Sequence, residues 1–429
     1  MKAMIIRYLR ARAKAIREKF NPRVIAVTGS MGKTSTKEAI AIVLARAGSV
    51  RTSQKNFNNE IGVPLTILGQ QSPGKSLFGW MKLFRKSYSI KNYPEYLLLE
   101  FGADHPGDIK ALCELAPPDV SIVTGISPVH AEYFKDIDAL IEEKMEIVRQ
   151  LRPKGVAILN GDEKRILDRK DQSQAKVVSY GLNGDISARN IRLSTRYDDH
   201  YERDDIFSMT YADVYEKGSM MGTLELKNIL GYASVISCLA AIAVGREEGI
   251  MPMESIRELN KHIKPLPGRL RPIAGIKGSL ILDDTYNAAP AAMQLGLDTL
   301  SQFTPVEEND RRIAVLGAMA ELGSYTEQEH RLIGLKAAEV ADIFIGVGAN
   351  MHIAVEAAKE AGIDTGSVKW FATSKEAGRE MDRIVQEGDI VYVKGSQSTR
   401  MEHVVKDIMA DPASANTLLV RQDRKWLGE

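Results

Sequence analysis

Short apolar runs alternate along this chain with stretches of helical periodicity. Residues 23–28 read RVIAVT, an apolar and β-branched run typical of a buried strand. A tight glycine turn at 29–32 leads into residues 33–47, whose apolar positions have helical spacing. The other expected elements of this unit are strands at 96–100, 120–124 and 155–160 and a helix at 139–151. Strands that alternate with helices predict a parallel, doubly wound sheet.

The pattern changes in residues 187–226, which alternate without long helical periodicity. We expect a small antiparallel β segment at the sheet edge there, followed by a helix at 232–249. Leu266-Pro267-Gly268 then interrupts the pattern and marks the expected start of a second α/β unit. The expected elements of that unit are strands at 280–283, 312–316, 343–347 and 390–393 and helices at 292–300, 327–341 and around Val355.

The turn after the first strand has the composition of a phosphate loop. It reads Thr28-Gly29-Ser30-Met31-Gly32-Lys33-Thr34-Ser35. Glycines let backbone N–H groups turn toward phosphate oxygens, and the helix N-terminus adds partial positive charge. We expect Lys33 to bridge the β- and γ-phosphates of ATP and the Thr34 hydroxyl to bind Mg²⁺. The alternative, a chance Gly-Lys-Thr, is disfavoured by the strand before the turn and the helix after it.

Two polar side chains follow other strands of the same predicted sheet. Glu100 ends one strand and His130 follows another. Because the carboxyl ends of parallel strands gather at one edge, we expect both near Lys33, where oxygen ligands suit Mg²⁺. The alternatives are a solvated strand end for Glu100 and a structural histidine at His130. Lys144, which has acidic neighbours on a predicted helix, has the pattern of an exposed surface lysine.

Together these patterns predict an α/β protein. Its central P-loop ATPase domain would hold the parallel sheet with the small β segment, and a C-terminal Rossmann-like α/β domain would follow. The predicted boundaries are 1–22 for an N-terminal basic helix and linker, 23–265 for the central ATP-binding domain and 266–429 for the C-terminal domain. A length of 429 residues fits two or three domains.

Composition and charge narrow the class of protein. The chain is 44% hydrophobic and 26% charged with a net charge of +1, which is typical of a globular enzyme and gives no sign of nucleic-acid binding. Its two cysteines, Cys113 and Cys238, lie among apolar neighbours, which predicts buried free thiols in a reducing, cytoplasmic compartment. No apolar run has the length of a transmembrane segment.

The N-terminal segment 1–20 is basic. Its apolar stretch at 4–6 is too short for the core of a signal peptide. We expect a solvated helix that packs on the first domain. The alternative is a weak contact with an anionic membrane surface.

Further motifs follow the phosphate loop in a fixed order. They are Asn56-Phe57-Asn58-Asn59-Glu60-Ile61-Gly62-Val63-Pro64-Leu65-Thr66, Glu100-Phe101-Gly102, Pro128-Val129-His130-Ala131-Glu132, Lys144 with Glu146, Gly268-Arg269, Asp283-Asp284-Thr285-Tyr286-Asn287-Ala288-Ala289-Pro290, Leu316-Gly317-Ala318-Met319-Ala320-Glu321-Leu322-Gly323 and Lys394-Gly395-Ser396. From about residue 23 to the C-terminal region, this series resembles the Mur ligase family, and within it the MurF branch. The resemblance implies an ATP-dependent amide-bond ligase of cell-wall peptide synthesis, which activates a carboxylate as an acyl phosphate and passes it to an amine.

The resemblance also implies roles for individual residues. Thr34 and Glu100 would hold Mg²⁺ together with Lys33 at the phosphates, and His130 would bind a second Mg²⁺. Lys144 matches the lysine that the family carbamylates, which would make it a carboxylate-like support for that metal and part of the catalytic set. The implied nucleotide contacts are Gly29, Ser30, Met31, Gly32, Lys33, Thr34, Ser35, Asn59, Arg269, Asp284, Tyr286 and Asn287.

The chain departs from the family pattern in two ways. The MurF branch carries an N-terminal domain that grips the UDP end of its substrate, whereas only residues 1–22 precede the first strand here. We therefore expect either an acceptor without UDP or a partner chain that supplies the contact. Ser237 replaces a family Asn near the adenine, so we expect the nucleotide contact there to be weaker or reorganised. The C-terminal domain, which selects the amine in this family, has Ala289, Ala292, Ala318 and Gln397 in place of Asn, Ser, Asp and Arg. These changes predict an altered amine, an amino acid or dipeptide.

Two other functions are considered beside this one. Ligases of the folyl-polyglutamate and poly-γ-glutamate type also lack the UDP-binding domain, although the Asp-Asp-Thr-Tyr-Asn-Ala segment at 283–288 favours the peptidoglycan branch. The third function is a non-catalytic, nucleotide-binding scaffold derived from a ligase.

Overall fold

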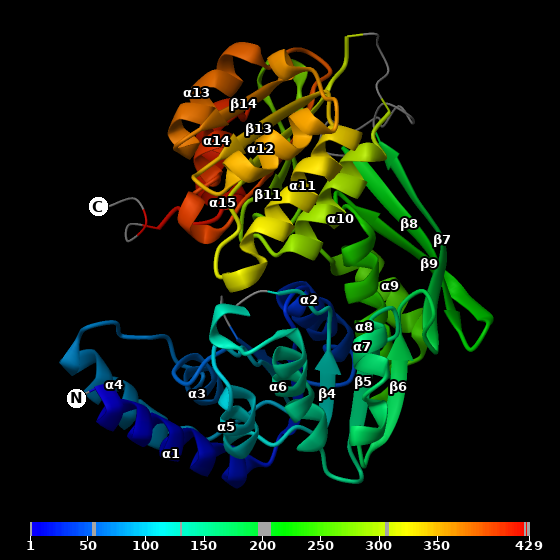
Figure 1. Ribbon diagram of the computed structural model, residues 1–429. Coiled ribbons are helices and arrows are strands. Elements are labelled where there is room, and N and C mark those ends of the chain that lie inside the picture. The colour runs from blue at the N-terminus through cyan, green and yellow to red at the C-terminus, as the bar shows by residue number, and fades with distance from the viewer. Residues whose placement is uncertain are drawn as a thin grey trace.

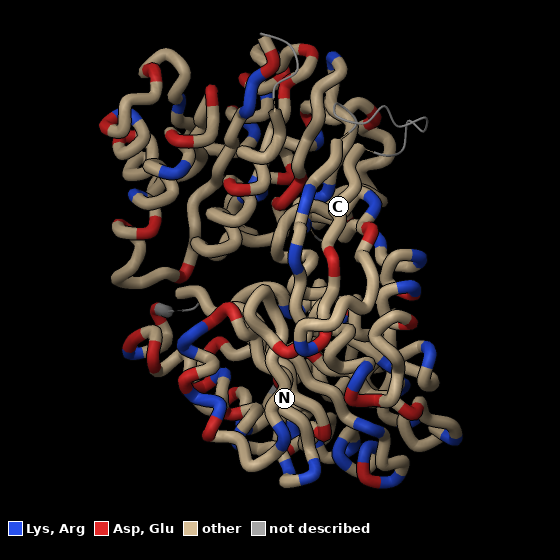
Figure 2. Tube along the Cα trace, turned by 90° about the vertical axis from the view of Figure 1, so that its right-hand side faces the viewer, with Lys and Arg blue, Asp and Glu red and all other residues tan. Residues whose placement is uncertain are grey.

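Two layered α/β units make up the protein, one above the other in Figure 1. The computed structural model describes residues 2–53, 57–128, 131–195, 207–304, 309–423 and 426. Lys and Arg are interspersed with Asp and Glu over the surface seen in Figure 2, in keeping with the small net charge. None of the described helices combines the length and the apolar character that a membrane crossing requires.

The first unit is built on a large sheet. In the described part of the chain this sheet has nine strands in the order β2-β3-β1-β4-β5-β6-β7-β8-β9. Strands β2 to β7 pair in parallel, and β7, β8 and β9 pair antiparallel, so the predicted β segment extends the main sheet at its edge. The strands are β1 (Arg23–Thr28), β2 (Val50–Thr52), β3 (Tyr96–Glu100), β4 (Val120–Val123), β5 (Val156–Asn160), β6 (Lys176–Tyr180), β7 (Ile186–Thr195), β8 (Ser208–Glu216) and β9 (Ser219–Lys227).

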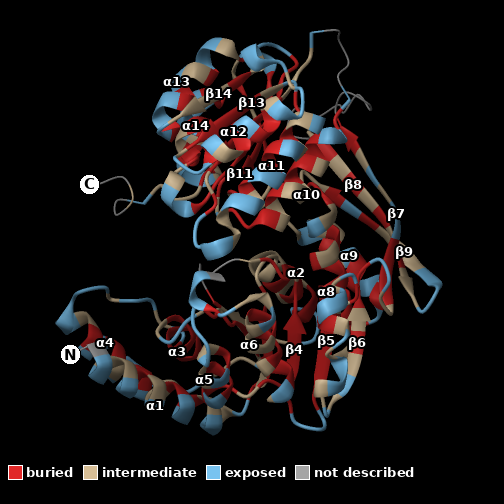
Figure 3. Ribbon diagram, in the orientation of Figure 1, coloured by how far each residue is buried: buried red, intermediate tan, exposed pale blue. Residues whose placement is uncertain are grey.

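Helices cover both faces of this sheet, which is why its central parallel strands β1, β3, β4 and β5 are buried along almost their whole length. In β1, Ile25 and Val27 enter one core and Val24 and Ala26 the other. The helices are α1 (Lys2–Phe20), α2 (Lys33–Leu44), α3 (Gly62–Leu68), α4 (Leu77–Tyr88), α5 (Asp108–Leu115), α6 (Ile137–Arg149), α7 (Lys164–Leu167), α8 (Tyr232–Glu247) and α9 (Pro252–His262). Figure 3 shows the resulting buried strands between half-exposed helices.

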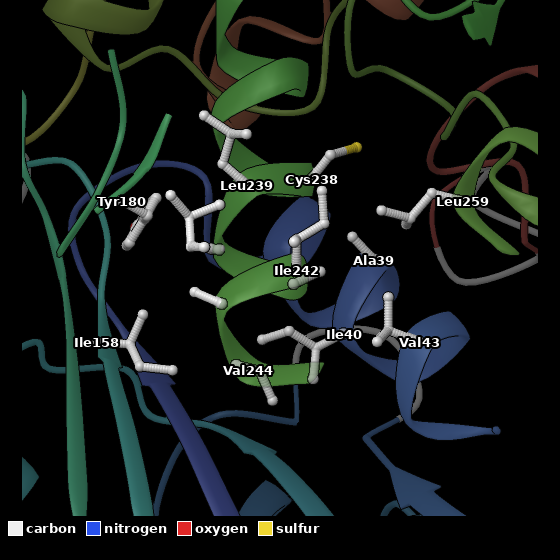
Figure 4. Close-up of a cluster of buried hydrophobic side chains, with 14 of the residues drawn as sticks. Ala39, Ile40, Val43, Ile158, Tyr180, Cys238, Leu239, Ile242, Val244 and Leu259 are labelled. Carbon is white, nitrogen blue, oxygen red and sulfur yellow. The ribbon is translucent and has the colours of Figure 1, made fainter. Parts of the chain in front are cut away.

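Helix α8 is buried along most of its length, and it packs between α2 and the sheet. Figure 4 shows its residues Leu239 and Ile242 among side chains of α2, β5, β6 and α9. Cys238 on α8 and Cys113 on α5 are buried and free, as predicted. The position of α8 fixes the start of α2, and with it the phosphate loop.

The second unit has its own sheet. Over the described residues the strand order is β10-β11-β15-β12-β13-β14, parallel except for the edge strand β10. The strands are β10 (Arg271–Ala274), β11 (Leu280–Asp284), β12 (Arg312–Gly317), β13 (Ile343–Val347), β14 (Val368–Phe371) and β15 (Ile390–Lys394). The helices are α10 (Pro290–Ser301), α11 (Thr326–Val340), α12 (Met351–Glu360), α13 (Ser374–Ile384), α14 (Glu402–Ile408) and α15 (Ala415–Leu418). Short 3₁₀ turns include η1 (Ala131–Tyr133) and η4 (Gly323–Tyr325), which lie against each other across the two units.

The N-terminal segment is a helix packed on the first unit, as expected. Leu9, Ala13 and Ile16 of α1 are buried in the core on that side. They are spaced by four and three residues, so they share one face of the helix. The basic side chains occupy the remaining faces.

Candidate active site

The phosphate loop is held against the end of strand β4. Gly29 has φ +144°, and a Cβ added there would lie 2.0 Å from Thr124 Oγ1, so this position requires glycine. Thr124 Oγ1 in turn donates a hydrogen bond of 2.6 Å to the Met31 carbonyl oxygen. Gly32 is left-handed (φ +80°) and opens helix α2. The loop is thus clamped at the carboxyl edge of the sheet, where ligands of such folds bind.

Two backbone N–H groups of the loop do not point where the sequence suggested. Ser30 N and Met31 N donate to the Gly125 carbonyl oxygen at 2.8 and 3.3 Å, because the chain forms a short antiparallel bridge there. The remaining donors are the first N–H groups of α2, which have no partner within the helix. The Ser30 hydroxyl oxygen is buried with no hydrogen-bond partner in the described structure. A phosphate oxygen would satisfy it.

The Lys33 ammonium group folds back over the loop. Its Nζ atom donates to the carbonyl oxygens of Gly29, at 2.7 Å, and Ser30, at 3.3 Å. Burial lowers the pKa of Lys33, the nearby Glu100 carboxylate raises it, and the Arg269 guanidinium lowers it again. The pKa of Lys33 therefore depends on Glu100 of the first unit and on Arg269 of the second.

Glu100 lies beside the loop, as the strand order predicted. The Thr34 hydroxyl donates to Glu100 Oε2 at 3.2 Å, and Asn58 Nδ2 donates to Glu100 Oε1 at 3.2 Å. Glu100 is almost fully buried, so the alternative of a solvated strand end is wrong. A hydroxyl and a carboxylate oxygen at the phosphates are ligands that suit Mg²⁺.

Asn58, and not Asn59, makes the contact at Glu100. The Asn59 side chain accepts hydrogen bonds from the N–H groups of Ile61, at 3.2 Å, and Gly62, at 3.0 Å, and thereby caps the start of α3. Adjacent asparagines are indistinguishable by composition. Only the path of the backbone decides which of them faces the strand end.

Lys144 is buried, which corrects the expectation of an exposed surface lysine. It lies on the inner face of α6, with its Nζ atom 3.5 Å from the Ala103 carbonyl oxygen. Burial, followed by the charge of Lys33, lowers the pKa of Lys144 to about 7, against weaker opposing effects of nearby carboxylates. A buried amine that loses its proton near neutral pH can act as a nucleophile.

His130 lies outside the described residues, so its expected position beside Glu100 stays a prediction. The described residues include no group of three or more His, Cys, Asp and Glu placed to hold a metal ion. A Mg²⁺ ion that keeps several waters and shares phosphate oxygens needs fewer protein ligands than that. The Thr34 hydroxyl and the Glu100 carboxylate are two oxygen groups of the kind that such an ion uses.

The second unit contributes a charged cluster. Lys394 Nζ lies 2.7 Å from Asp284 Oδ2, and both residues are buried. The Tyr392 hydroxyl donates to the same oxygen at 3.4 Å. The Arg269 guanidinium carbon lies 3.9 Å from the ring centre of Tyr286, a cation–π contact that fixes this arginine. The sequence did not single out Lys394 as a site residue, although it ends strand β15 as Glu100 ends β3.

A cleft runs between the two units from the phosphate loop. Gly32 and Ser35 of the loop region line one part of it opposite Arg269 and Asp284. Ser35, Ser237 and Arg269 also line a neighbouring, more apolar cavity of about 250 Å³ that reaches the end of α9. Ser237 accepts a hydrogen bond from the Thr36 hydroxyl at 3.3 Å. The two cavities together offer a charged end and an apolar end, the arrangement that a nucleotide requires.

Asn287 lines a different cavity. This cavity of about 470 Å³ lies within the second unit and is also lined by Glu321, Gln397, Arg400 and Trp426. Asn287 therefore lines a different cavity from Asp284, although the two residues are close in sequence. The chain turns after β11, which sends consecutive side chains to two sides of the loop.

This geometry agrees with the comparison to known proteins. The Mur ligase middle domain family matches residues 27–244, and the Mur ligase glutamate ligase domain matches residues 268–397. The chain belongs to the Mur ligase family. As a member it is a MurF-like, ATP-dependent ligase that forms C–N bonds and acts in peptidoglycan precursor synthesis.

Among the relatives of this Mur ligase is a Bacillus subtilis UDP-N-acetylmuramoyl-tripeptide–D-alanyl-D-alanine ligase, 28% identical, with 94% of this chain and 79% of the relative covered. The Haemophilus influenzae enzyme of the same name is 30% identical, with coverage of 92% and 78%. MurF from Thermotoga maritima, solved in complex with ADP, superposes with a TM-score of 0.76 at 26% identity and covers 94% of this chain and 83% of its own.

Folylpolyglutamate synthase from Mycobacterium tuberculosis has a TM-score of 0.62 at 15% identity, with 92% of this chain and 94% of that chain covered, which shows a shared fold alone. The sequence relatives therefore decide in favour of the peptidoglycan branch over the folylpolyglutamate alternative. They also decide for an enzyme over a non-catalytic scaffold.

Proposed function

We propose that this Mur ligase phosphorylates the carboxylate of a peptide acceptor with ATP and passes the acyl group to an amine. We also propose the division into a basic helix at 1–22, a central domain at 23–265 and a C-terminal domain at 266–429. The observation that supports the chemistry most directly is the buried contact of Thr34 with Glu100, at 3.2 Å, beside the Lys33 ammonium group. It combines phosphate-binding and magnesium-binding groups in one place.

In the first step an acceptor carboxylate oxygen attacks the γ-phosphorus of ATP, the bond to the β–γ bridging oxygen breaks, and ADP leaves. Negative charge spreads over the transferred phosphoryl oxygens. Lys33 and the first N–H groups of α2 lie where they can stabilise that charge. When bound at Thr34 and Glu100, Mg²⁺ would neutralise further phosphate charge.

In the second step the amine nitrogen attacks the acyl carbon. Phosphate leaves with the bonding electron pair, the amine loses a proton, and an amide remains. Water would hydrolyse the acyl phosphate, so the site has to exclude it. The cleft between the two units suits this need, because loop residues such as Gly32 and second-unit residues such as Arg269 line the same cavity.

We propose that Lys144 is carbamylated. Its neutral amine would attack CO₂ and release a proton, which leaves an anionic carbamate on Nζ. The low pKa of Lys144, about 7, supplies the neutral amine near physiological pH. The positive charge of Lys33, which lowers the pKa of Lys144, would then stabilise the negative charge of the carbamate. His130 would bind the second Mg²⁺ with this carbamate.

ATP is proposed to lie with its phosphates at the loop and its adenine in the apolar cavity beside Ser237. Gly29, Ser30, Met31, Gly32 and Ser35 would surround the phosphates. Arg269, stacked on Tyr286, would approach the phosphates from the second unit. Asp284 would contribute to ATP binding indirectly, through its ion pair with Lys394. Asn59 would contribute to ATP binding indirectly, through its hydrogen bonds to the N–H groups at the start of α3.

The amine is proposed to enter the cavity lined by Asn287. The relatives are named for UDP-N-acetylmuramoyl-tripeptide and D-alanyl-D-alanine. A cavity of about 470 Å³ with Arg400 in its wall fits an amino acid or dipeptide whose carboxylate needs a cation. Gln397, in the position of a family arginine, alters this wall, so the preferred amine is proposed to differ from D-alanyl-D-alanine.

The test is turnover of ATP to ADP by the full chain with candidate acceptors and amines. UDP-N-acetylmuramoyl-tripeptide, the same peptide without UDP, D-alanyl-D-alanine and single amino acids form the panel, and mass spectrometry identifies the amide. Lys33→Met is the inactive control. The proposal would be contradicted if the chain is folded but none of the tested pairs of acceptor and amine leads to ADP release. A partner chain that supplies acceptor contacts stays a prediction, which co-purification with the tagged full chain tests.

A further inference from the structure

Apolar side chains gather on the outer face of helix α4. Leu77, Phe78 and Met81 are exposed by 55%, 74% and 62%, although they are large and apolar. The opposite face of the same helix, with Trp80 and Leu83, is buried in the core. The helix is therefore apolar on both sides, and only one side has a partner within the described part of the chain.

Hydrogen bonds and ring contacts attach helix α4 to α1, so the outer face of α4 is held in place by a second helix. Arg12 of α1 donates to the Ser87 hydroxyl and carbonyl oxygens at 3.1 and 2.8 Å, and its guanidinium carbon lies 3.8 Å from the ring centre of Tyr88. Tyr8 and Phe84 pack edge to face with ring centres 4.5 Å apart. In Figure 1 the pair forms the corner of the first unit that lies away from the second unit.

The charged residues of this corner are mostly basic. Residues 61–94 include five Lys or Arg and no Asp or Glu, and α1 has Glu18 as its single acidic residue. The whole chain has a net charge of only +1, so positive charge is concentrated here. Lys82, Arg85 and Lys86 are exposed on α4 itself, beside the apolar side chains.

A cationic groove lies between α3 and α4. Arg51, Lys82 and Lys86 line this cavity of about 720 Å³ together with Gln70 and Ser72, and none of the described lining residues is acidic. Arg51 is held in place by a hydrogen bond to the Ile67 carbonyl oxygen. Three cations around one cavity suit a phosphate group.

We propose that the α1–α4 corner docks on the surface of an anionic phospholipid bilayer. Leu77, Phe78 and Met81 would enter the boundary between headgroups and acyl chains, while the Lys and Arg side chains pair with lipid phosphates. The groove at Arg51 takes one such headgroup. An acidic protein would satisfy the charges, but a protruding row of large apolar side chains with lysines on its flank has the composition of an interfacial helix.

The test is co-sedimentation of the full chain with vesicles of equal parts phosphatidylglycerol and phosphatidylcholine. We expect binding that weakens as salt rises and a much lower affinity for pure phosphatidylcholine. Phe78→Ser with Met81→Ser should weaken binding about tenfold or more, and so should Lys82→Glu with Arg85→Glu. The matched control is Met251→Ser with Met253→Ser, two methionines exposed by 61% and 63% on the α9 side, which should bind as the unchanged chain does.

Several results would overturn the proposal: no binding to the anionic vesicles, equal binding to neutral vesicles, or the same loss in the control pair as in the α4 pairs. Capture of an acidic protein without vesicle binding would count against it too. Circular dichroism melting of each variant shows that it is folded. Vesicle binding is measured without turnover, so its failure is distinguishable from a failure of the proposed ligase reaction.

Discussion

Lys144 and Lys394 are buried lysines, and Lys33 is partly buried at the phosphate loop. Burial lowers the pKa of each of them, and the nearby charges differ. Lys394 is paired with Asp284 at 2.7 Å, whereas Lys144 has only the Ala103 carbonyl oxygen within hydrogen-bond distance among its described contacts. The same residue type therefore serves as a fixed cation in one place and as a candidate nucleophile in another.

The low pKa of Lys144 predicts a pH dependence of stability. Below about pH 7 its amine is protonated in the folded and unfolded states alike. Between about pH 7 and the ordinary lysine value of about 10.4, the unfolded state holds an extra proton, so the free energy of unfolding rises with pH. Urea denaturation in CO₂-free buffer measures this. Lys144→Met should reduce the rise, and Lys110→Met, which removes an exposed lysine of α5, should not.

Carbamylation of Lys144 predicts chemical rescue. Lys144→Ala should lose ligase activity, because the anionic group on Nζ is gone, and formate or acetate should restore part of it. The measurement is amide formation against carboxylate concentration, with chloride at equal ionic strength as the control. No recovery at any concentration, in a variant that still binds ATP, would contradict the role of the carbamate.

Gly29 predicts a steric limit on the phosphate loop. In Gly29→Ala the new Cβ would meet Thr124 Oγ1 at 2.0 Å in a backbone conformation of φ +144°, so the loop has to move. We expect ATP affinity to fall about tenfold or more, as measured by isothermal titration calorimetry. Gly107→Ala is the control, since Gly107 also has positive φ but no atom within 4 Å of its added Cβ. Equal losses in both variants would argue against the clamp.

At the scale of elements, the phosphate loop depends on the helix behind it. Helix α2 starts at Lys33 and packs on α8, which is buried along most of its length. Gly245 of α8 is needed where the helices approach, because an added Cβ would lie 2.6 Å from Val43 of α2. The sequence of α8 has almost no polar face, and such a helix is expected in the interior of a large unit.

The packing of α8 predicts that truncation of one buried side chain lowers the free energy of unfolding strongly. Ile242 is fully buried among side chains of the α2–α8 core, as Figure 4 shows. Ile242→Ala should cost about 2–5 kcal/mol of unfolding free energy, since the cavity cannot fully collapse. Met251→Ala, exposed at the start of α9, should change it by about 0.5 kcal/mol or less. Urea denaturation followed by circular dichroism compares the two variants. A small effect at Ile242 would mean that the core repacks.

At the scale of the whole molecule, the site is divided between two units. The loop that we propose to bind the nucleotide belongs to the first unit and Arg269 to the second, and the pKa of Lys33 responds to both Glu100 and Arg269. The two units also touch through η1 and η4. A reaction that has to exclude water benefits from such a cleft, because movement of one unit can open and close it.

Arg269 predicts that the second unit contributes to ATP binding. Arg269→Ala should weaken the binding of a non-hydrolysable ATP analogue about tenfold, because the cation stacked on Tyr286 is lost from the cleft. The matched control is Arg271→Ala, two residues along the chain and outside the lining of the cleft. Calorimetric titration with Mg²⁺ present measures both. Equal affinity in the two variants would show that the nucleotide is bound by the first unit alone.

Much of this site was accessible from the sequence. The strand-turn-helix pattern with Lys33 predicted the phosphate loop, and the parallel strand order brought Glu100 to it, because strand ends of one sheet share an edge. Which of two asparagines faces Glu100 was not accessible, nor was the placement of Asn287 in a second cavity. Both depend on where the backbone turns, which the residue types do not encode.

The sequence by itself determined the alternation of strands and helices in both units, because apolar periodicity and glycine turns are local properties of the chain. Elements such as α3, α4 and α13 were not predicted. It also determined the family, through motifs in a fixed order. Only the tertiary structure decided that Lys144 is buried and that α4 presents an apolar face outward. Burial depends on contacts between segments far apart in the sequence, so the same lysine on the same helix could have faced water or the core.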